Sequence, residues 1–103
     1  ILINPAAWVA GPLKAEHWQA LLRARAIENG MYVVGVGRVD PAGTPMRQRR
    51  FVGNSCVVDP FGIIHESGGF FDEELVVDEI NLVNVREARA FIPVFEHRRP
   101  ELY

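Results

Sequence analysis

The stretch Met31-Tyr32-Val33-Val34-Gly35-Val36-Gly37-Arg38-Val39 decides the fold class of this 103-residue chain. Nearly all of its side chains are apolar, which predicts a strand covered on both faces, as in the sheets of α/β proteins. Gly35 and Gly37 lie two residues apart and therefore on one face of the strand. Glycines at such positions leave room for another backbone or a side chain. The sequence thus predicts a close contact on that face.

A helix is expected directly before this strand, over residues 13–29. Trp18, Leu22 and Ala26 recur at intervals of four residues and give one apolar stripe. Asn29-Gly30 is a typical helix end, because glycine readily adopts the left-handed conformation found there. The pattern predicts a helix that leads straight into the strand.

The rest of the chain predicts further strands and one short second helix. The predicted strands cover residues 1–3, 51–58, 63–66 and 75–80, and a turn at 59–62 makes the second and third of them a hairpin. Asn81 is a candidate N-cap for a helix that Pro93 ends. The order β-α-β-β-β-β-α indicates an α/β or α+β layered domain. Two helices cannot cover such a sheet, so we expect a partner segment to supply a missing layer.

The composition limits the size of the domain and the kinds of partner that the protein can have. The chain is one small domain at most, with 49% hydrophobic residues and a net charge of -2. This charge gives no general attraction to nucleic acid or anionic lipid, and the apolar runs are too short to span a bilayer. A single cysteine excludes an internal disulfide framework and suits a reducing compartment, so we expect a cytoplasmic location. The chain starts with three apolar residues and no initiator Met, and we interpret it as a fragment or a processed piece of a larger protein.

The residues alone contain no complete catalytic constellation. Cys56 lies inside an apolar strand, where a free cysteine packs as a small hydrophobe. Ser55, Asp59 and His65 have the composition of a hydrolase triad, but no Gly-x-Ser-x-Gly elbow is present. Ser55 is therefore interpreted as a hydrogen-bonded strand residue.

The histidines and arginines give no clear site either. The three histidines have no metal-ligand spacing, so neither a metal site nor a cofactor is expected. Arg47, Arg49 and Arg50 indicate a solvated loop or, alternatively, a site for a substrate carboxylate or phosphate. Residues 4–8 follow a strand end, where ligands of α/β proteins often bind, and they form either a pocket wall or a structural loop.

Five stretches in order resemble the carbon–nitrogen hydrolase (nitrilase) superfamily. They are Ile1-Leu2-Ile3-Asn4-Pro5-Ala6-Ala7-Trp8, His17-Trp18, Leu22-Arg23-Ala24-Arg25-Ala26-Ile27-Glu28-Asn29-Gly30, Gly53-Asn54-Ser55-Cys56-Val57-Val58-Asp59-Pro60-Phe61-Gly62 and Arg98-Arg99-Pro100-Glu101-Leu102-Tyr103. The resemblance extends over nearly the whole chain. It implies that residues 1–103 are the C-terminal part of one hydrolase domain. That part would be half of an α-β-β-α sandwich and incomplete on its own, without the nucleophile-bearing N-terminal part.

The same resemblance implies the chemistry. Enzymes of this superfamily use a Glu-Lys-Cys triad, in which cysteine attacks an amide, carbamoyl or nitrile carbon and forms a thioester that water hydrolyses. All three positions would lie upstream of Ile1, so no catalytic residue is expected in this chain. Neither Cys56 nor Lys14, the only lysine, matches a catalytic position.

Site residues are carried over from the resemblance one by one. Asn4, Ala6 and Trp8 are predicted to line the substrate pocket. The predicted structural motif comprises Arg25, Glu28, Asn29, Ser55, Asp59, Pro60 and Gly62. The predicted subunit interface comprises His17, Trp18, Leu21, Leu102 and Tyr103, with the helix over 13–29 forming a homodimer.

The expected function is amidase-type hydrolysis of a small amide or nitrile, with the missing N-terminal half as partner. Two alternatives stay open. One is a catalytically inactive fragment that acts only in packing and oligomerisation. The other is a glutaminase-type domain that feeds a synthetase. No nucleic-acid or membrane partner is expected.

Overall fold

A four-stranded mixed sheet in the order β1-β2-β3-β4 forms the centre of the computed structural model, which describes residues 1–103. The strands are β1 (Leu2–Ala6), β2 (Val33–Gly37), β3 (Cys56–Val58) and β4 (Ile64–Ser67). β1 and β2 run parallel, whereas β3 is antiparallel to both β2 and β4. The strand predicted within residues 31–39 is confirmed as an inner strand, and β3 and β4 form the predicted hairpin.

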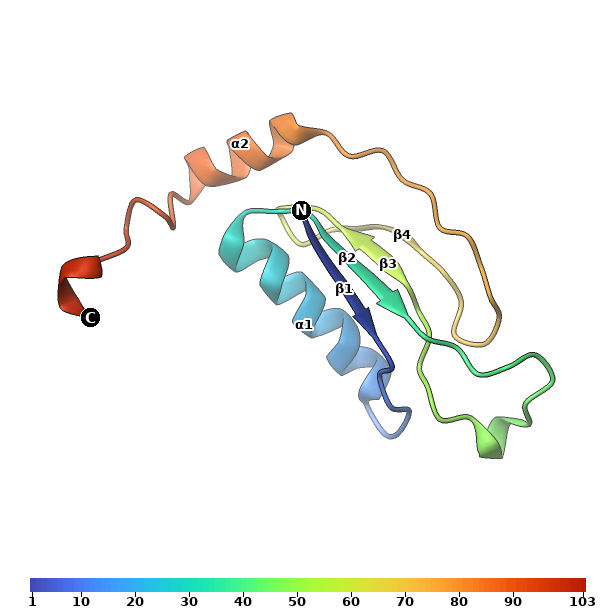
Figure 1. Ribbon diagram of the computed structural model, residues 1–103. Coiled ribbons are helices and arrows are strands. Elements are labelled where there is room, and N and C mark those ends of the chain that lie inside the picture. The colour runs from blue at the N-terminus through green and yellow to red at the C-terminus, as the bar shows by residue number, and fades with distance from the viewer.

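Helix α1 (Lys14–Asn29) connects β1 to β2 and lies along one face of the sheet (Figure 1). Its end is confirmed at Gly30, which has a φ of 52° and donates its N–H to the last turn of the helix. The glycine is needed there because this conformation is costly for a residue with a Cβ.

The hydrophobic core lies between α1 and the sheet. Its buried residues are Trp18, Leu22, Ala26, Val33, Cys56 and Val58. The close contact predicted at Gly35 is confirmed, since a Cβ built there would lie 2.4 Å from Cδ1 of Leu22. The absent side chain thus lets the helix stripe sit directly on β2.

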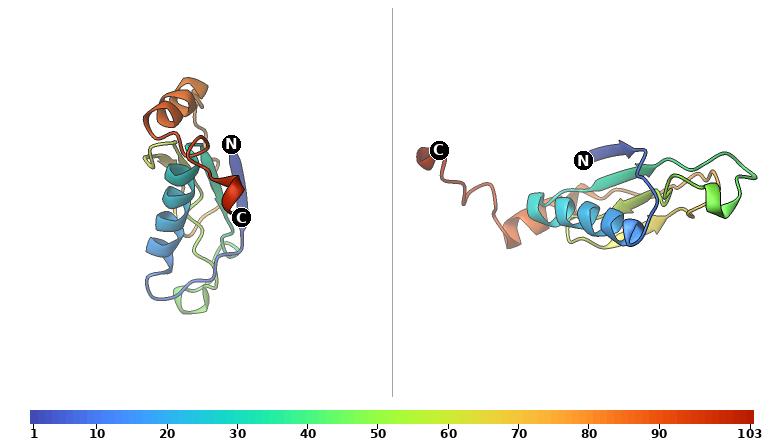
Figure 2. Two further views of the ribbon diagram at one scale, coloured as in Figure 1. Left: turned by 90° about the vertical axis from the view of Figure 1, so that its left-hand side faces the viewer. Right: turned by 90° about the horizontal axis from the view of Figure 1, so that it is seen from below.

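The other face of the sheet carries no helix (Figure 2). Because successive side chains of a strand alternate between faces, Ile3, Val34 and Val36 point away from α1. Ile3 is 66% exposed and Val36 is 45% exposed. The sheet is therefore apolar on a face that this chain leaves largely open.

The C-terminal part leaves the sheet. Helix α2 (Leu82–Phe91) begins at the predicted N-cap, where the side chain of Asn81 accepts the N–H of Val83 at 2.9 Å, and it ends before Pro93. A 3-10 turn, η2 (Pro100–Leu102), closes a tail that reaches away from the body (Figure 1). Neither helix is long and apolar enough to cross a membrane.

The strand predicted over residues 75–80 is wrong. The segment is extended but pairs with no other strand. Its side chains do alternate, since Leu75 and Val77 are exposed while Val76 and Asp78 are partly buried. Alternation reports a half-covered surface, not the presence of a hydrogen-bonding neighbour, and the sequence pattern cannot separate the two.

Two strand boundaries also differ from prediction. The strand expected over 51–58 is reduced to Cys56–Val58, because Gly53 and Asn54 have positive φ angles that interrupt it. The strand expected over 1–3 instead continues through Pro5 to Ala6. Proline is tolerated because β1 is an edge strand of this sheet, and an edge position does not require the N–H that proline lacks.

Candidate functional site

The carboxyl ends of β1 and β2 form the candidate site. The two strands end side by side because they are parallel, and the N–H of Arg38 donates to the carbonyl of Ala6 at 3.0 Å. A shallow, widely open cavity of about 380 Å³ lies at this edge, lined by Pro5, Ala6, Ala7, Val36, Gly37 and Arg38. Ligands of α/β proteins bind at such strand ends.

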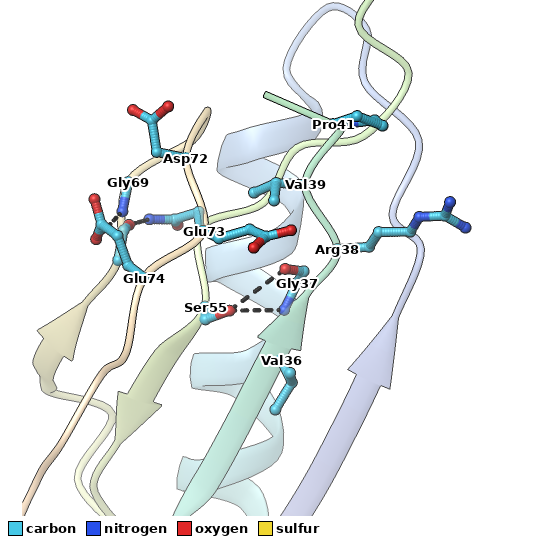
Figure 3. Close-up of a pocket in the computed structure, with 12 residues that line it drawn as sticks. Val36, Gly37, Arg38, Val39, Pro41, Ser55, Gly69, Asp72, Glu73 and Glu74 are labelled. Carbon is cyan, nitrogen blue, oxygen red and sulfur yellow. Dashed lines mark hydrogen bonds between the residues drawn. The ribbon is translucent and has the colours of Figure 1, made fainter. Parts of the chain in front are cut away.

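A second cavity of about 470 Å³ adjoins the first (Figure 3). It lies between the end of β2 and the loop that carries Asp72, Glu73 and Glu74. Ser55 lines this cavity beside the end of β2, where its Oγ accepts the N–H of Gly37 at 3.0 Å. This is the hydrogen-bonded role predicted for Ser55, although the residue lies just before β3.

Gly37 is required by the close approach of the loop at Gly53. A Cβ built on Gly37 would lie 1.8 Å from the carbonyl oxygen of Gly53. The N–H of Gly53 also donates to the carbonyl of Arg38 at 3.0 Å. The contact that the glycine spacing predicts is therefore backbone against backbone.

Asn54 holds this loop in place. Its backbone is left-handed, with a φ of 52°, and the residue is 3% exposed. Its side-chain amide donates to the carbonyl of Gly68 at 2.9 Å, and its Oδ1 accepts from Gln19 at 2.8 Å. Its carbonyl accepts the indole N–H of Trp18 at 2.8 Å. One residue thus ties helix α1 to the two loops beside the cavity.

The predicted pocket residues Asn4, Ala6 and Trp8 line one cavity, but a different one. This cavity, of about 280 Å³, lies between β1 and α1 and not beyond the strand ends. Trp8 is fixed there, because its indole N–H donates to the carbonyl of Lys14 at 2.8 Å and its ring lies 5.9 Å from that of Trp18. Only Ala6 faces both this cavity and the one at the strand ends.

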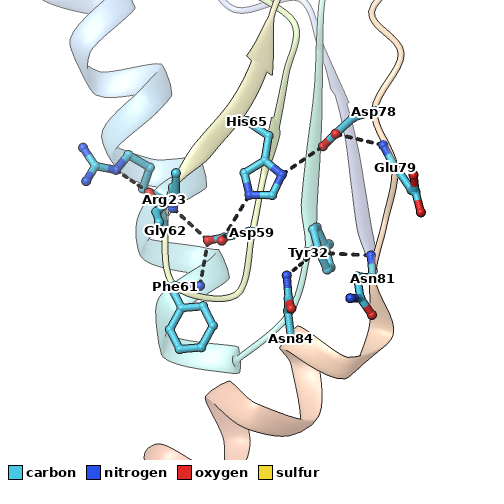
Figure 4. Close-up of polar contacts among 11 residues, drawn as sticks. Arg23, Tyr32, Asp59, Phe61, Gly62, His65, Asp78, Glu79, Asn81 and Asn84 are labelled. Carbon is cyan, nitrogen blue, oxygen red and sulfur yellow. Dashed lines mark hydrogen bonds and ion pairs between the residues drawn. The ribbon is translucent and has the colours of Figure 1, made fainter.

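The Ser55–His65–Asp59 alternative is not assembled. His65 lies 3.2 Å from Asp59, but also 3.3 Å from Asp78, and this cluster is near the β3–β4 turn (Figure 4). Ser55 precedes β3, at the end of that strand away from Asp59, and bonds to Gly37. Ser55 is therefore separated from the His65–Asp59 pair by the length of β3.

Asp59 shapes the turn in which Pro60 and Gly62 lie. Its Oδ1 accepts the N–H groups of Phe61 and Ile63, both at 2.9 Å. The carbonyl of Gly62 accepts from the guanidinium of Arg23 at 2.8 Å, which attaches the turn to α1 (Figure 4). These contacts give the turn motif a structural role.

The other predicted motif residues act within α1. Arg25 pairs with Glu28 on the exposed surface of the helix. The side-chain amide of Asn29 donates to the carbonyl of Arg25 at 3.0 Å. Each of these contacts joins neighbouring turns of one helix.

The residues predicted for a subunit interface fall into two groups. His17 and Leu21 are exposed on α1, and Leu102 and Tyr103 are exposed in the tail. Trp18 is 2% exposed and packs in the core of its own chain. The structure thus places Trp18 with the core residues and the other four on the surface.

Cys56 is buried, as the apolar strand predicts. Burial raises the pKa of its thiol, which disfavours the thiolate that a nucleophile requires. No group of three or more His, Cys, Asp or Glu side chains is arranged to hold a metal ion.

Two of the three clustered arginines bond to other groups of this chain. Arg49 donates to the carbonyl of Phe71 at 2.9 Å, and the backbone N–H of Arg50 donates to Asp40 at 2.7 Å. Burial opposes ionisation of Asp40, but the N–H groups of Phe51 and Arg50 and the nearby guanidinium groups outweigh it and lower its pKa. Arg47 has no polar partner.

Sequence reasoning missed Arg38. The available signal is a single charged residue near the end of the apolar stretch 31–39. The structure shows why it matters, since β1 and β2 end together and bring Arg38 to the wall of the cavity.

Comparison with known proteins identifies a matching family and two similar enzymes. The carbon-nitrogen hydrolase family model matches residues 1–90. The chain is 40% identical over 109 residues to deaminated glutathione amidase of Homo sapiens, covering 100% of this chain and 30% of that protein. It is 37% identical over 99 residues to deaminated glutathione amidase of Escherichia coli O157:H7, covering 96% of this chain and 34% of that protein.

A solved structure agrees with these relatives. The crystal structure of the NitFhit protein of C. elegans superposes with a TM-score of 0.74 at 36% identity, covering 98% of this chain and 24% of that one. This chain spans about a third of the length of the two amidases named above. The matched fold and the matched family model together show that this chain belongs to the carbon–nitrogen hydrolase family.

Proposed function

We propose that residues 1–103 are the C-terminal part of an amidase whose N-terminal part supplies the catalytic groups. The observation that carries the proposal is the match to amidases of which this chain covers about a third. The longer protein that contains both parts, the complete enzyme, hydrolyses an amide of the kind named in the relatives. Deaminated glutathione is the first substrate to test.

The open face of the sheet supports the incompleteness of the chain. The radius of gyration is 15.8 Å, whereas a compact domain of this length has about 13 Å. Ile3 and Val36 are exposed on the face away from α1, and Leu75 and Val77 are exposed on the unpaired segment beside it. A second sheet from the N-terminal part would cover these side chains and complete an α-β-β-α sandwich.

In the proposed reaction, a cysteine thiolate outside this chain attacks the carbonyl carbon of the amide. The C–N bond breaks as the nitrogen takes a proton from the catalytic glutamic acid, and ammonia or an amine leaves. Water, deprotonated by that glutamate, then attacks the thioester and releases the acid and the cysteine. This chain contributes the cavity wall at the ends of β1 and β2, where small side chains leave room for substrate.

We also propose that the enzyme is a cytoplasmic homodimer. The exposed residues His17 and Leu21 on α1 and Leu102 and Tyr103 in the tail would meet the second copy. Tyr103 is 94% exposed although it is a large aromatic residue, and the tail carries it away from its own chain. Aromatic residues of this kind are enriched in protein interfaces.

An assay of the amine that hydrolysis frees from deaminated glutathione, cysteinylglycine, tests the proposed amidase. The complete enzyme is expected to turn over, and its Cys56→Ala variant is expected to keep its rate within about twofold, because Cys56 is a buried core thiol. Residues 1–103 alone are expected to show no turnover. Activity of the isolated chain that Cys56→Ala abolishes would contradict the proposal.

A further inference from the structure

We propose that Arg38 is a specificity residue that binds a carboxylate of the substrate, so that the enzyme prefers anionic amides. The inference rests on the amidase function proposed above. Deaminated glutathione already carries carboxylates, so the inference adds the residue of this chain that recognises one of them.

The backbone of Arg38 is fixed at the site. Its N–H donates to the carbonyl of Ala6 at 3.0 Å, and its carbonyl accepts from the N–H of Gly53 at 3.0 Å. These bonds join it to the end of β1 on one side and to the loop before β3 on the other. A residue held in this way presents its side chain from a defined position.

The guanidinium of Arg38 is positioned by an aromatic ring but forms no ion pair with a carboxylate of this chain. Its Cζ lies 4.6 Å from the centroid of the Phe51 ring, a cation–π contact that orients the group and leaves its N–H donors free. Its side chain has no hydrogen bond and no ion pair. The nearby carboxylate of Asp40 is used by the N–H groups of Arg50 and Phe51.

Most other arginines differ in this respect. The partners are Gly62 for Arg23, Glu28 for Arg25, Phe71 for Arg49, Asp40 for Arg50, Gly30 for Arg89 and Glu101 for Arg99. Arg47, Arg86 and Arg98 are also unpaired, but none of them lines a cavity at the strand ends. Arg38 is therefore the one arginine that has an unpaired guanidinium and also lines a cavity at the strand ends.

The cavity around Arg38 has the chemistry of a site for one anionic group. In the strand-end cavity the neighbours of Arg38 are small or apolar and carry no charge, whereas the larger cavity, which Arg38 also borders, contains three carboxylates. Figure 3 shows Arg38 directed toward the end of β1, away from Glu73 and Glu74. The planar guanidinium can donate two parallel hydrogen bonds to a carboxylate. The geometry therefore favours an amide that carries a carboxylate at one end.

Two probe amides that differ in one group test the inference with the complete enzyme. Glutaramate carries an amide and a carboxylate, whereas glutaramide carries an amide at both ends and is neutral. The measured quantity is the ratio of kcat/KM for glutaramate to that for glutaramide, from initial rates of ammonia release. Arg38→Gln is expected to lower this ratio about tenfold or more, since it removes a charge-assisted hydrogen-bonded pair.

Two further variants complete the design. Arg47→Gln removes an unpaired loop arginine and is expected to leave the ratio within about twofold of wild type. Arg38→Lys keeps the charge but not the planar fork and is expected to lower the ratio about threefold or more. Arg38→Lys can therefore test the inference if Arg38→Gln does not fold.

The outcomes separate the inference from the function on which it rests. A wild-type ratio retained in the Arg38 variants, with glutaramide hydrolysed normally, would overturn the role of Arg38 and leave the amidase standing. An equal fall of the ratio in Arg47→Gln would also overturn it, because general charge attraction would then explain the preference. A wild-type enzyme that hydrolyses neither these amides nor deaminated glutathione would overturn both proposals, whereas one that hydrolyses only deaminated glutathione would overturn the inference alone.

Discussion

Replacing Gly37 by alanine is expected to lower the free energy of unfolding of the complete enzyme by about 3 kcal/mol or more. The added Cβ would lie 1.8 Å from the carbonyl oxygen of Gly53, which is backbone and cannot rotate away. β2 and the loop before β3 must separate, and the hydrogen bond from Gly53 to Arg38 is weakened as they do. Denaturant unfolding measures the change.

Gly35→Ala is the matched control for this prediction. Its Cβ would also collide, at 2.4 Å, but with Cδ1 of Leu22, the end of a flexible side chain. We expect a smaller loss of about 1–2 kcal/mol, because a side chain can move where a backbone cannot. A Gly37→Ala variant as stable as wild type, or less affected than Gly35→Ala, would show that the loop does not approach β2 as described.

Replacing Asn54 by alanine is expected to cost about 3 kcal/mol of stability. The carbonyl of Gly68 and the side-chain amide of Gln19 both lose their partner, and a buried group left without a hydrogen bond costs about 1–3 kcal/mol. Alanine is also strained at the φ of 52° that Asn54 adopts, which adds about 1 kcal/mol. Equilibrium unfolding of the complete enzyme measures the sum.

Asn54→Gly separates these two causes. Glycine loses the same side-chain hydrogen bonds but adopts the left-handed conformation without strain. We therefore expect this variant to be more stable than Asn54→Ala by about 1 kcal/mol. Two variants of equal stability would refute the strain, and two variants close to wild type would refute the anchoring role of Asn54.

The sequence predicts best those structural features that depend on one residue type at one position. Gly35 and Gly37 indicated a close approach, and Gly30 indicated the end of α1, because a Cβ is excluded at each place. The apolar stripe of α1 and the hairpin around Asp59 are predictable from residue spacing and from turn residues. In each case the signal is local and its physical cause is short-range.

The sequence failed where the answer depends on a distant neighbour. Residues 75–80 have the alternation of a strand, but a strand also needs a partner, and the sheet of this chain provides none. Trp18 was predicted at a subunit interface, yet its indole bonds to Asn54, 36 residues away, beneath the sheet. Whether an apolar residue faces its own core or another chain depends on packing that no local pattern contains.

The candidate site was predictable only in part. Residues Asn4, Ala6 and Trp8 share a cavity, but Pro5 does not end the strand, so that cavity lies beside β1. Arg38 becomes a site residue only because β1 and β2 are parallel and end together. The pairing of the strands, not either sequence segment alone, creates the edge at which the substrate is proposed to bind.

Peptide mapping of the complete enzyme after partial inactivation by iodoacetamide tests the central claim most directly. Iodoacetamide alkylates thiolates, and burial disfavours the thiolate of Cys56. We expect the loss of amidase activity to follow the labelling of a cysteine outside residues 1–103, with Cys56 unlabelled. Labelling of Cys56 in proportion to the lost activity would contradict the claim that this chain builds the pocket wall while another part of the protein supplies the nucleophile.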